Sequence, residues 1–292
     1  MQEYKQLEAA EKKLYKNIKK LYGRELTSIQ KELAAYYQKY GTNNIIEYRA
    51  LLEQLTPAER DLLYRDFEAF AMKYPQYSKY AEIRAEAYKI NRLEGLEANI
   101  RLNQYKQGMI EAEEYQKHLE KMTRLGYNSA TNGQSAMIIS DRTVRLIASD
   151  VWGPDKDIAA EILGKKAAEA EKMFNAIKNG FVRGDSYSRM AKTVEERFEV
   201  NYKSAKRWIY TEGTRVMSEG KAQGFQDMGY TKYIFRTMED DRVCDVCEAL
   251  NGEEFSFAER SPGDNFPPMH ANCRCTFEVV NEPDEETNGQ QL

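Results

Sequence analysis

The sequence predicts a mainly α-helical fold with a small β element, and three observations support this. Apolar residues recur with the period of a helix through about the first 125 residues. One segment, "YTKYIFRTM" (230–238), alternates apolar and polar residues as a strand does. All four cysteines and one of the two histidines then lie in two short stretches, "CDVCEAL" and "HANCRC". These stretches indicate a small module near the C-terminus that differs from the helices before it.

The composition sets the broad class of the protein. A chain of 292 residues is long enough to bury a sizeable core without covalent staples. The net charge of −4 is mild, so it neither suggests a protein that binds nucleic acid nor excludes a local basic patch. The N-terminus lacks the continuous apolar stretch of a secretory signal, and no segment approaches the roughly 20 apolar residues of a membrane span. We therefore expect a protein kept in a cytosol, where thiols stay reduced and disulfides are uncommon.

The N-terminal region, residues 1–125, is predicted to be a series of amphipathic helices. A first helix is expected to end at Gly23, and a second to begin at the cap Thr27. A third begins at "TPAE", where Thr56 is the N-cap, Pro57 occupies the first helical position and Glu59 completes a capping box. Pro75 is expected to close this helix, and helix is expected to continue over 80–109, with a break near Gly95 or Gly108.

The lysine cluster "EKKLYKNIKK" in this region is expected to be a solvated helix face. Contact with DNA is the weaker interpretation, because acidic residues interleave the lysines. His118 is a lone helical histidine, and nothing near it in the sequence indicates a ligand.

Residues 126–154 are rich in Asn, Ser, Gly and Asp and are predicted to form a linker. Three helices are expected next, at about 157–178, from Ser186 or Ser188 through "RMAKTVEERF", and at about 204–228. Gly229 is predicted to follow the last of them as a C-cap residue. The strand and the cysteine-rich stretches complete a module at 155–280. The acidic tail 281–292 is predicted to be disordered.

The cysteine-rich stretches have the spacing of metal ligands. Cys244 and Cys247 form C-x2-C, whose tight turn places two thiolates on one edge of a tetrahedron. His270, Cys273 and Cys275 form H-x2-C-x-C, so five donors compete for the four positions of a structural zinc. We predict Cys244, Cys247, His270 and Cys273 as the ligands, with Cys275 as the alternative to Cys273.

Three other kinds of site are alternatives to structural zinc. A redox C-x2-C pair needs a helix-opening position in a βαβ context and leaves the other donors unexplained. Disulfides need an oxidising compartment. A catalytic zinc needs a general base, for which only Glu248 and Asp245 lie nearby in the sequence. Structural zinc is favoured because the polar segment between the half-sites, 248–269, is expected to bury too little apolar area to order itself.

The motifs of the second half resemble the phage Mu F-like family of minor head morphogenesis proteins. "TEGTRVMSEGKAQGF", "DDRVCDVCEALNGEEF" and "PGDNFPPMHANCRC" follow the family's pattern in order and spacing. The matching positions are Thr211, Glu212, Asp240 or Asp241, Arg242, Cys244, Cys247, Leu250, Gly252, Phe255, Pro267, Pro268, His270, Cys273, Arg274 and Cys275. The resemblance covers about 155–280. It departs from the pattern at Tyr210, where an arginine is common.

The resemblance implies a protein that is not an enzyme. It implies a low-copy component of a tailed-phage virion, located inside the capsid at the portal vertex after assembly in the host cytoplasm. It also implies binding to the portal protein and a part in head assembly, DNA packaging or DNA ejection, with the major capsid or scaffolding protein as a further expected partner and no membrane. Two alternatives stay open: a zinc-stabilised DNA-binding protein, in which "NYKSAKRW" and Arg274 meet phosphates, and a metal-dependent hydrolase.

Overall fold

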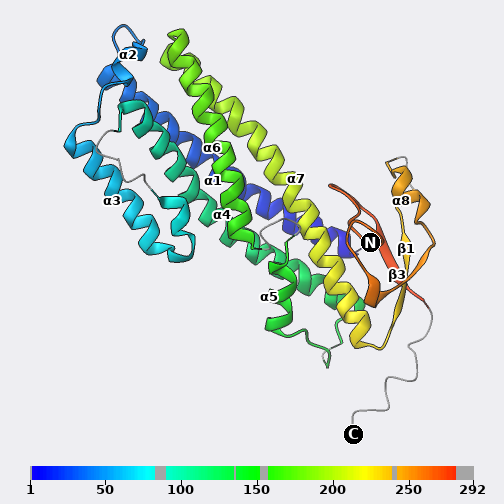
Figure 1. Ribbon diagram of the computed structural model, residues 1–292. Helices are drawn as coiled ribbons and strands as arrows, with labels where there is room; N and C mark the ends of the chain where they lie inside the picture. Colours follow the sequence, from blue (N-terminus) through cyan, green and yellow to red (C-terminus); the bar gives the residue numbers. More distant parts are fainter. Residues whose placement is uncertain (1, 83–89, 135, 152–156, 239–241, 281–292) are drawn as a thin grey trace. The chain divides into compact units, whose positions relative to one another are not determined.

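The computed structural model describes residues 2–82, 90–134, 136–151, 157–238 and 242–280. These residues form long helices followed by a small three-stranded antiparallel sheet of order β2-β1-β3 (Figure 1). The predicted fold class, mainly α with a small β element, is confirmed. The predicted tail, 281–292, lies outside the described residues. None of the described helices combines the length and hydrophobicity that crossing a bilayer requires.

Helix α1 is a single helix, Gln2–Tyr40, so the predicted break at Gly23 is wrong. The buried stripe explains why: Leu14 and Ile18 precede the glycine, and Ile29 and Leu33 continue the same face beyond it. One helical glycine costs only about 1 kcal/mol, which burial along this stripe outweighs.

The next long helix begins where the sequence predicts a helix start. After the short helix α2 (Tyr48–Leu51), α3 spans Pro57–Lys73 and begins with the predicted capping box. Thr56 accepts a hydrogen bond from the backbone N–H of Glu59, whose carboxylate accepts one in return from the N–H of Thr56. The 3-10 helix η1 (Pro75–Ala81) follows at once.

Helix α4 spans Arg92–Ala130 without the break expected at Gly95 or Gly108. At both positions the absence of a side chain admits a neighbour: a Cβ at Gly95 would lie 2.7 Å from Leu55, and one at Gly108 would lie 3.1 Å from Lys166. Glycine at these two positions allows a neighbouring side chain to pack closely and does not end the helix.

Two predictions about the second half need correction. The stretch 126–154 holds the last turn of α4 and the whole of α5 (Asp141–Ser149), whose cap Ser140 accepts from the N–H of Thr143. After α6 (Ile158–Arg183), the helix expected from Ser186 or Ser188 through 198 and the helix expected at about 204–228 form one helix, α7 (Tyr187–Asp227). Buried residues lie in both parts of this helix, and the polar run between Phe198 and Ile209 contains no Gly or Pro that would end it. Gly229 has the positive φ predicted for a C-cap residue.

The described chain divides into two compact units. Unit 1 comprises residues 1–15, 114–156 and 204–292, and unit 2 comprises 16–113 and 157–203. The division into 1–125, 126–154, 155–280 and 281–292 stays a prediction.

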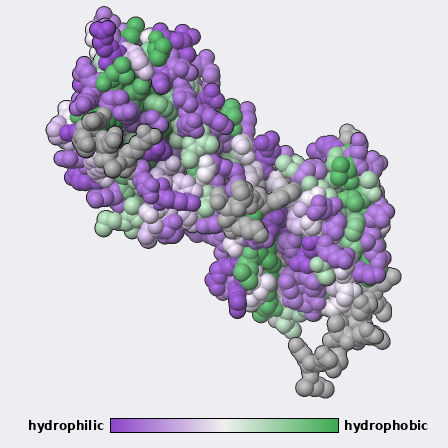
Figure 2. Space-filling model, in the orientation of Figure 1, coloured by the Kyte–Doolittle hydropathy of each residue, from purple (hydrophilic) through white to green (hydrophobic). Residues whose placement is uncertain are grey.

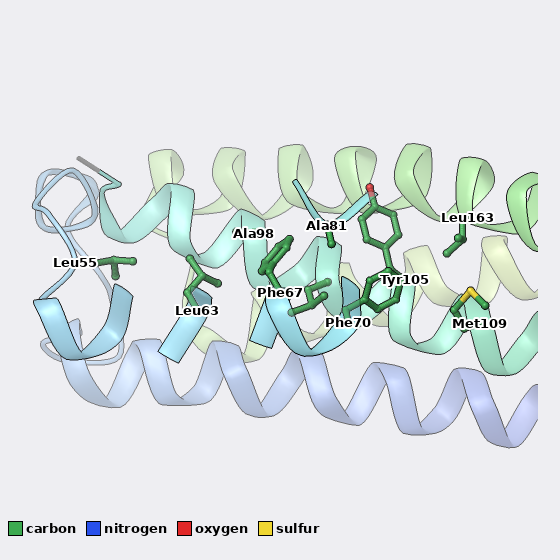
Figure 3. Packing of buried hydrophobic residues seen from close by; sticks show 10 residues of the cluster. Leu55, Leu63, Phe67, Phe70, Ala81, Ala98, Tyr105, Met109 and Leu163 are labelled. Atoms are coloured by element: carbon green, nitrogen blue, oxygen red, sulfur yellow. The ribbon is translucent and has the colours of Figure 1, made fainter. Parts of the chain in front are cut away.

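Unit 2 has a core of aliphatic and aromatic residues from α3 and α4, with Leu163 of α6 against it (Figure 3). Beside this core lies a buried cluster of charges. The Lys166 Nζ lies 3.3 Å from Glu25, 3.1 Å from Glu111 and 3.6 Å from Glu169. The ammonium also lies 4.2 Å from the ring centroid of Tyr22. Three carboxylates around one lysine leave an excess of negative charge, which favours a proton on one of them.

In unit 1, helices α4 and α7 approach so closely that their backbones nearly touch. A Cβ at Gly126 would lie 1.9 Å from the carbonyl oxygen of Met217, and one at Gly220 would lie 2.1 Å from that of Thr123. Gly224 meets the carbonyl oxygen of Tyr127 in the same way, at 3.0 Å. The spacing Gly220-x3-Gly224 places both glycines on one face of α7.

The sheet of unit 1 packs its inner face against α7. Strand β1 (Lys232–Arg236) pairs antiparallel with β2 (Glu254–Ser256) and with β3 (Thr276–Val279). Tyr233 lies among Phe257, Phe266 and Phe277, with Ala222 of α7 closing the cluster. On the visible face, hydrophobic residues also gather at the surface over α5, where Leu146 is 61% exposed (Figure 2).

Candidate metal centre

The first half-site is built on the short helix α8 (Asp245–Ala249). Cys244 is its N-cap, and its carbonyl oxygen accepts a hydrogen bond from the N–H of Glu248. Cys247 lies one turn further on and is buried. The first turn of the helix therefore sets the separation of the two thiols, as the C-x2-C spacing predicts.

The second half-site is a turn that leads into β3. The carbonyl oxygen of His270 accepts a hydrogen bond from the N–H of Cys273, and Asn272 between them has φ +61°. This turn brings the His270 Nε2 to 3.3 Å from the Cys244 Sγ and 3.4 Å from the Cys247 Sγ. The Sγ atoms of Cys247 and Cys273 are 4.0 Å apart.

The five predicted donors converge as two overlapping triads. The ligand atoms of Cys244, Cys247 and His270 lie within 4.8 Å of one another, and so do those of Cys247, Cys273 and Cys275. Cys247 belongs to both triads. Zinc bonds of about 2.3 Å to sulfur and 2.0 Å to nitrogen imply ligand separations of about 3.5–3.8 Å in a tetrahedron. The observed separations bracket that range, so the residues fit a tetrahedral cation. Which of Cys273 and Cys275 completes the set stays as open as in the sequence.

The orientation of His270 also suits a ligand. Its Nδ1 lies 3.0 Å from the carbonyl oxygen of Ala271, which can only accept a hydrogen bond. In the neutral ring Nδ1 therefore carries the proton, and Nε2 turns its lone pair toward the two sulfurs. A histidine that is fixed through its second nitrogen in this way is the usual arrangement at metal sites.

Without a cation, the four thiols cannot all ionise together. A hydrogen bond from the backbone of Cys247 lowers the pKa of Cys244. A hydrogen bond from Cys275 lowers the pKa of Cys273 to about 5 and raises that of Cys275. Burial raises the pKa of Cys247 to about 12. The pKa of His270 is raised by the hydrogen bond that its ring makes to the backbone of Ala271. A divalent cation would remove this conflict, because thiolate is the form that binds metal.

The centre lies against the end of the sheet. Phe235 of β1 and Met269 pack on the buried cysteines, and Phe255 contacts both this cluster and the aromatic cluster around Tyr233. The expectation that residues 248–269 bury too little to order themselves is wrong. Phe257 and Phe266 from this segment are fully buried in the aromatic cluster, so hydrophobic burial contributes to its order.

Thr211 connects helix α7 to the centre. Its Oγ1 accepts a hydrogen bond of 3.3 Å from the backbone N–H of Asn272, inside the turn between His270 and Cys273. The same hydroxyl donates to the carbonyl oxygen of Arg207 and is thereby oriented. The resemblance pointed to Thr211, but no sequence pattern showed that it holds the metal-site turn.

The other motif residues have structural surroundings. Glu212 is buried and pairs with Arg215 at 2.9 Å, and Arg215 also donates to the carbonyl oxygen of Ile147 at the end of α5. Gly252, with φ +89°, donates its N–H to the carbonyl oxygen of Phe235.

The remaining motif positions follow. Pro268 is buried and follows Pro267 through a cis peptide, and Arg242 is exposed beside the first half-site. Asp240 and Asp241 lie outside the described residues.

Three residues considered at the sequence level do not join the centre. His118 is buried in α4, with its Nε2 3.3 Å from where a Cβ of Gly213 would stand, and burial lowers its pKa to about 4. Asp245 and Glu248 are exposed on α8. The clusters of metal-binding groups found in the described part of the chain contain neither carboxylate.

The sequence profile of the family described as "Phage Mu protein F like protein" matches residues 171–278. The match begins within α6, ends within β3 and includes all five metal-site residues. The resemblance predicted from the motifs is confirmed for this part of the chain. No curated protein and no solved structure matches the sequence.

Proposed function

We propose that this chain, whose residues 171–278 belong to the phage Mu F-like family, is a minor head protein associated with the portal vertex of a tailed phage. The family match supports a role in head morphogenesis and a place in the virion. Portal association, and action in procapsid assembly, DNA packaging or DNA ejection, are the finer parts of the proposal.

The centre at Cys244, Cys247 and His270 is proposed to hold one structural zinc ion, with Cys273 or Cys275 as fourth ligand. The observation that carries this is the convergence of five sulfur and nitrogen donors from two segments 26 residues apart. When bound, the ion supplies a cross-link between α8 and the turn before β3. The protein's own part is to present thiolates, to fix His270 through Ala271, and to hold the turn through Thr211.

A structural role is proposed over a catalytic one. Glu212 is committed to Arg215, so it is not free to act as a base. Glu248 and Asp245 are exposed on α8 and stand in neither cluster of metal-binding groups. If Glu248→Gln abolishes a hydrolytic activity of the purified protein while its fold and metal content are kept, the proposal of a non-enzymatic role is wrong.

The proposal is tested on the full chain purified under reducing conditions. We expect one zinc per chain by elemental analysis and capture of the portal protein of the same phage. Cys247→Ser, which removes the donor common to both triads, should lose the metal. A protein that carries no metal would refute the structural centre, and a metal-loaded protein that does not bind the portal would refute the portal association alone.

A further inference from the structure

The outward face of helix α1 in unit 2 carries only positive charge. Between residues 16 and 31 the exposed residues are five cations, one glycine and one threonine: Lys16, Lys19, Lys20, Gly23, Arg24, Thr27 and Lys31. We call the five cations the α1 basic face. The segment's only acidic residue, Glu25, points inward and pairs with Lys166.

The burial of Glu25 removes the objection that the sequence raises against contact with a polyanion. There, acidic residues that interleave the lysines weakened the case for contact with a polyanion. In the folded chain Glu25 is 1% exposed and so does not offset the surface charge. Within the described residues, none of the five cations has a carboxylate within ion-pair distance. Their charges therefore remain available to a partner.

We propose that the α1 basic face binds the phosphate backbone of duplex DNA without reading its sequence. Fifteen helical steps at about 1.5 Å each span about 22 Å. Phosphates of one strand follow one another at about 3.4 Å along the duplex axis, so this length covers about six of them. Five cations spread over this length can therefore each meet a phosphate of such a row.

The shape of the face also suits a backbone. The surface at Gly23 is open, because an added Cβ would meet no atom within 4 Å, and it lies in a shallow recess. Lys20, Arg24, Thr27, Ser28 and Lys31 line this recess. Cationic donors around a recess are groups that contact phosphate oxygens.

The chemistry of the face favours DNA over two other anionic partners. An anionic membrane binds helices that also insert aliphatic or aromatic residues, and this face exposes none between residues 16 and 31. An acidic protein partner needs buried apolar or aromatic anchors for specific binding, which are also lacking here. A phosphate array requires only the cations. The inference depends on the helix alone and on neither the metal centre nor the portal proposal.

The test measures binding of the full chain to a fluorescein-labelled 20-base-pair duplex by anisotropy, from 50 to 300 mM NaCl. Five phosphate contacts predict that log K falls with log [NaCl] with a slope of about −4.5. The variant Lys20→Gln, Arg24→Gln, Lys31→Gln should flatten the slope by about 1 for each cation removed. Its affinity at 100 mM NaCl should fall roughly 30-fold or more. Two duplexes of unrelated sequence should bind equally.

A matched control removes the same charge from elsewhere in unit 2. Arg65, Lys73 and Lys172 are exposed and lie outside α1, so their joint change to Gln should alter affinity less than about 3-fold. The proposal is overturned if the wild-type chain does not bind DNA at 50 mM NaCl, or if the control loses as much affinity as the α1 variant. Binding to phosphatidylserine vesicles without binding to DNA also overturns it. Circular dichroism shows whether each variant is folded, and metal content is measured on the same samples.

Discussion

The contact between α4 and α7 in unit 1 makes a sharp prediction about Gly220. A Cβ at this position would lie 2.1 Å from the carbonyl oxygen of Thr123 and 2.9 Å from its carbonyl carbon. Ordinary van der Waals contacts of a Cβ begin at about 3.4 Å, so Gly220→Ala must separate the helices by roughly 1 Å. The obstacle is backbone, which cannot rotate away, so the cost should reach the upper part of the overpacking range, about 3 kcal/mol. Alanine regains about 1 kcal/mol of helix propensity, which leaves a net loss of about 2 kcal/mol.

Gly23 provides the matched control, because it is also a helical glycine but has open space around it. Gly23→Ala should stabilise the protein by about 1 kcal/mol through helix propensity alone. Urea unfolding followed by far-UV circular dichroism should shift the midpoint down for Gly220→Ala and up for Gly23→Ala. Trp208, which packs on Tyr115 in unit 1, reports on that unit by fluorescence in a Trp152→Phe background. A Gly220→Ala protein as stable as wild type would refute the close-packing argument.

Three further predictions follow from the same structure. Thr211→Val keeps the shape of the side chain but removes the acceptor for the Asn272 N–H, so zinc affinity should fall about 10-fold when it is measured in competition with a chromophoric chelator. Thr211→Ser keeps the hydroxyl, and its zinc affinity should stay within about 3-fold of wild type. Equal affinities for both variants would contradict the role of the hydroxyl. Burial raises the pKa of Glu25 to about 7, with Lys166 lowering it and Glu111 and Glu169 raising it, so the folded state binds a proton that the unfolded chain releases near pH 4.5. Stability from this group is therefore full below about pH 4.5 and is lost by roughly 3 kcal/mol as the pH rises through 7, and Glu25→Gln should flatten that part of the stability profile. Removal of the metal with a chelator should raise the rate of hydrogen exchange in α8 and residues 270–275, while β1 stays protected. Full unfolding of the sheet on chelation would contradict the inference that the aromatic cluster around Tyr233 stabilises the sheet independently of the metal.

Local signals in the sequence were reliable where the chemistry is local. The capping box at Thr56 and Glu59, the strand around Tyr233 and the positive φ at Gly229 all follow from interactions within a few residues. The errors arose where tertiary packing decides. Gly23 and Gly108 look like helix breaks in isolation, but a continuous buried stripe carries α1 through the first, and the second admits the side chain of Lys166.

At the candidate metal centre too, the features set by local sequence could be predicted, and those set by tertiary contacts could not. The spacing of the cysteines identified the donors, because a C-x2-C turn and an H-x2-C-x-C turn each fix their geometry within one turn of chain. The sequence could not show the fixing of His270 by Ala271, because either ring nitrogen could have faced the thiols. It also could not show the bond from Asn272 to Thr211, which joins residues 61 positions apart. Nor did it reveal that Glu25 is buried, and this burial leaves the cations as the only exposed charges of α1 between residues 16 and 31.

The aromatic cluster around Tyr233 and the cluster of buried cysteines reduce the part of the chain that a metal ion would have to order. Had the segment between the half-sites been polar throughout, the ion alone would have had to offset its ordering entropy. Instead Phe257 and Phe266 anchor the middle of the segment in the aromatic core, and Phe255 joins that core to the thiol cluster. The ion therefore has only the two ends left to fix: the first turn of α8 and the turn held by Thr211. Because that turn is bonded to α7 and α7 packs backbone to backbone on α4, a metal ion bound at the centre would constrain the helical body of unit 1 as well as the loop.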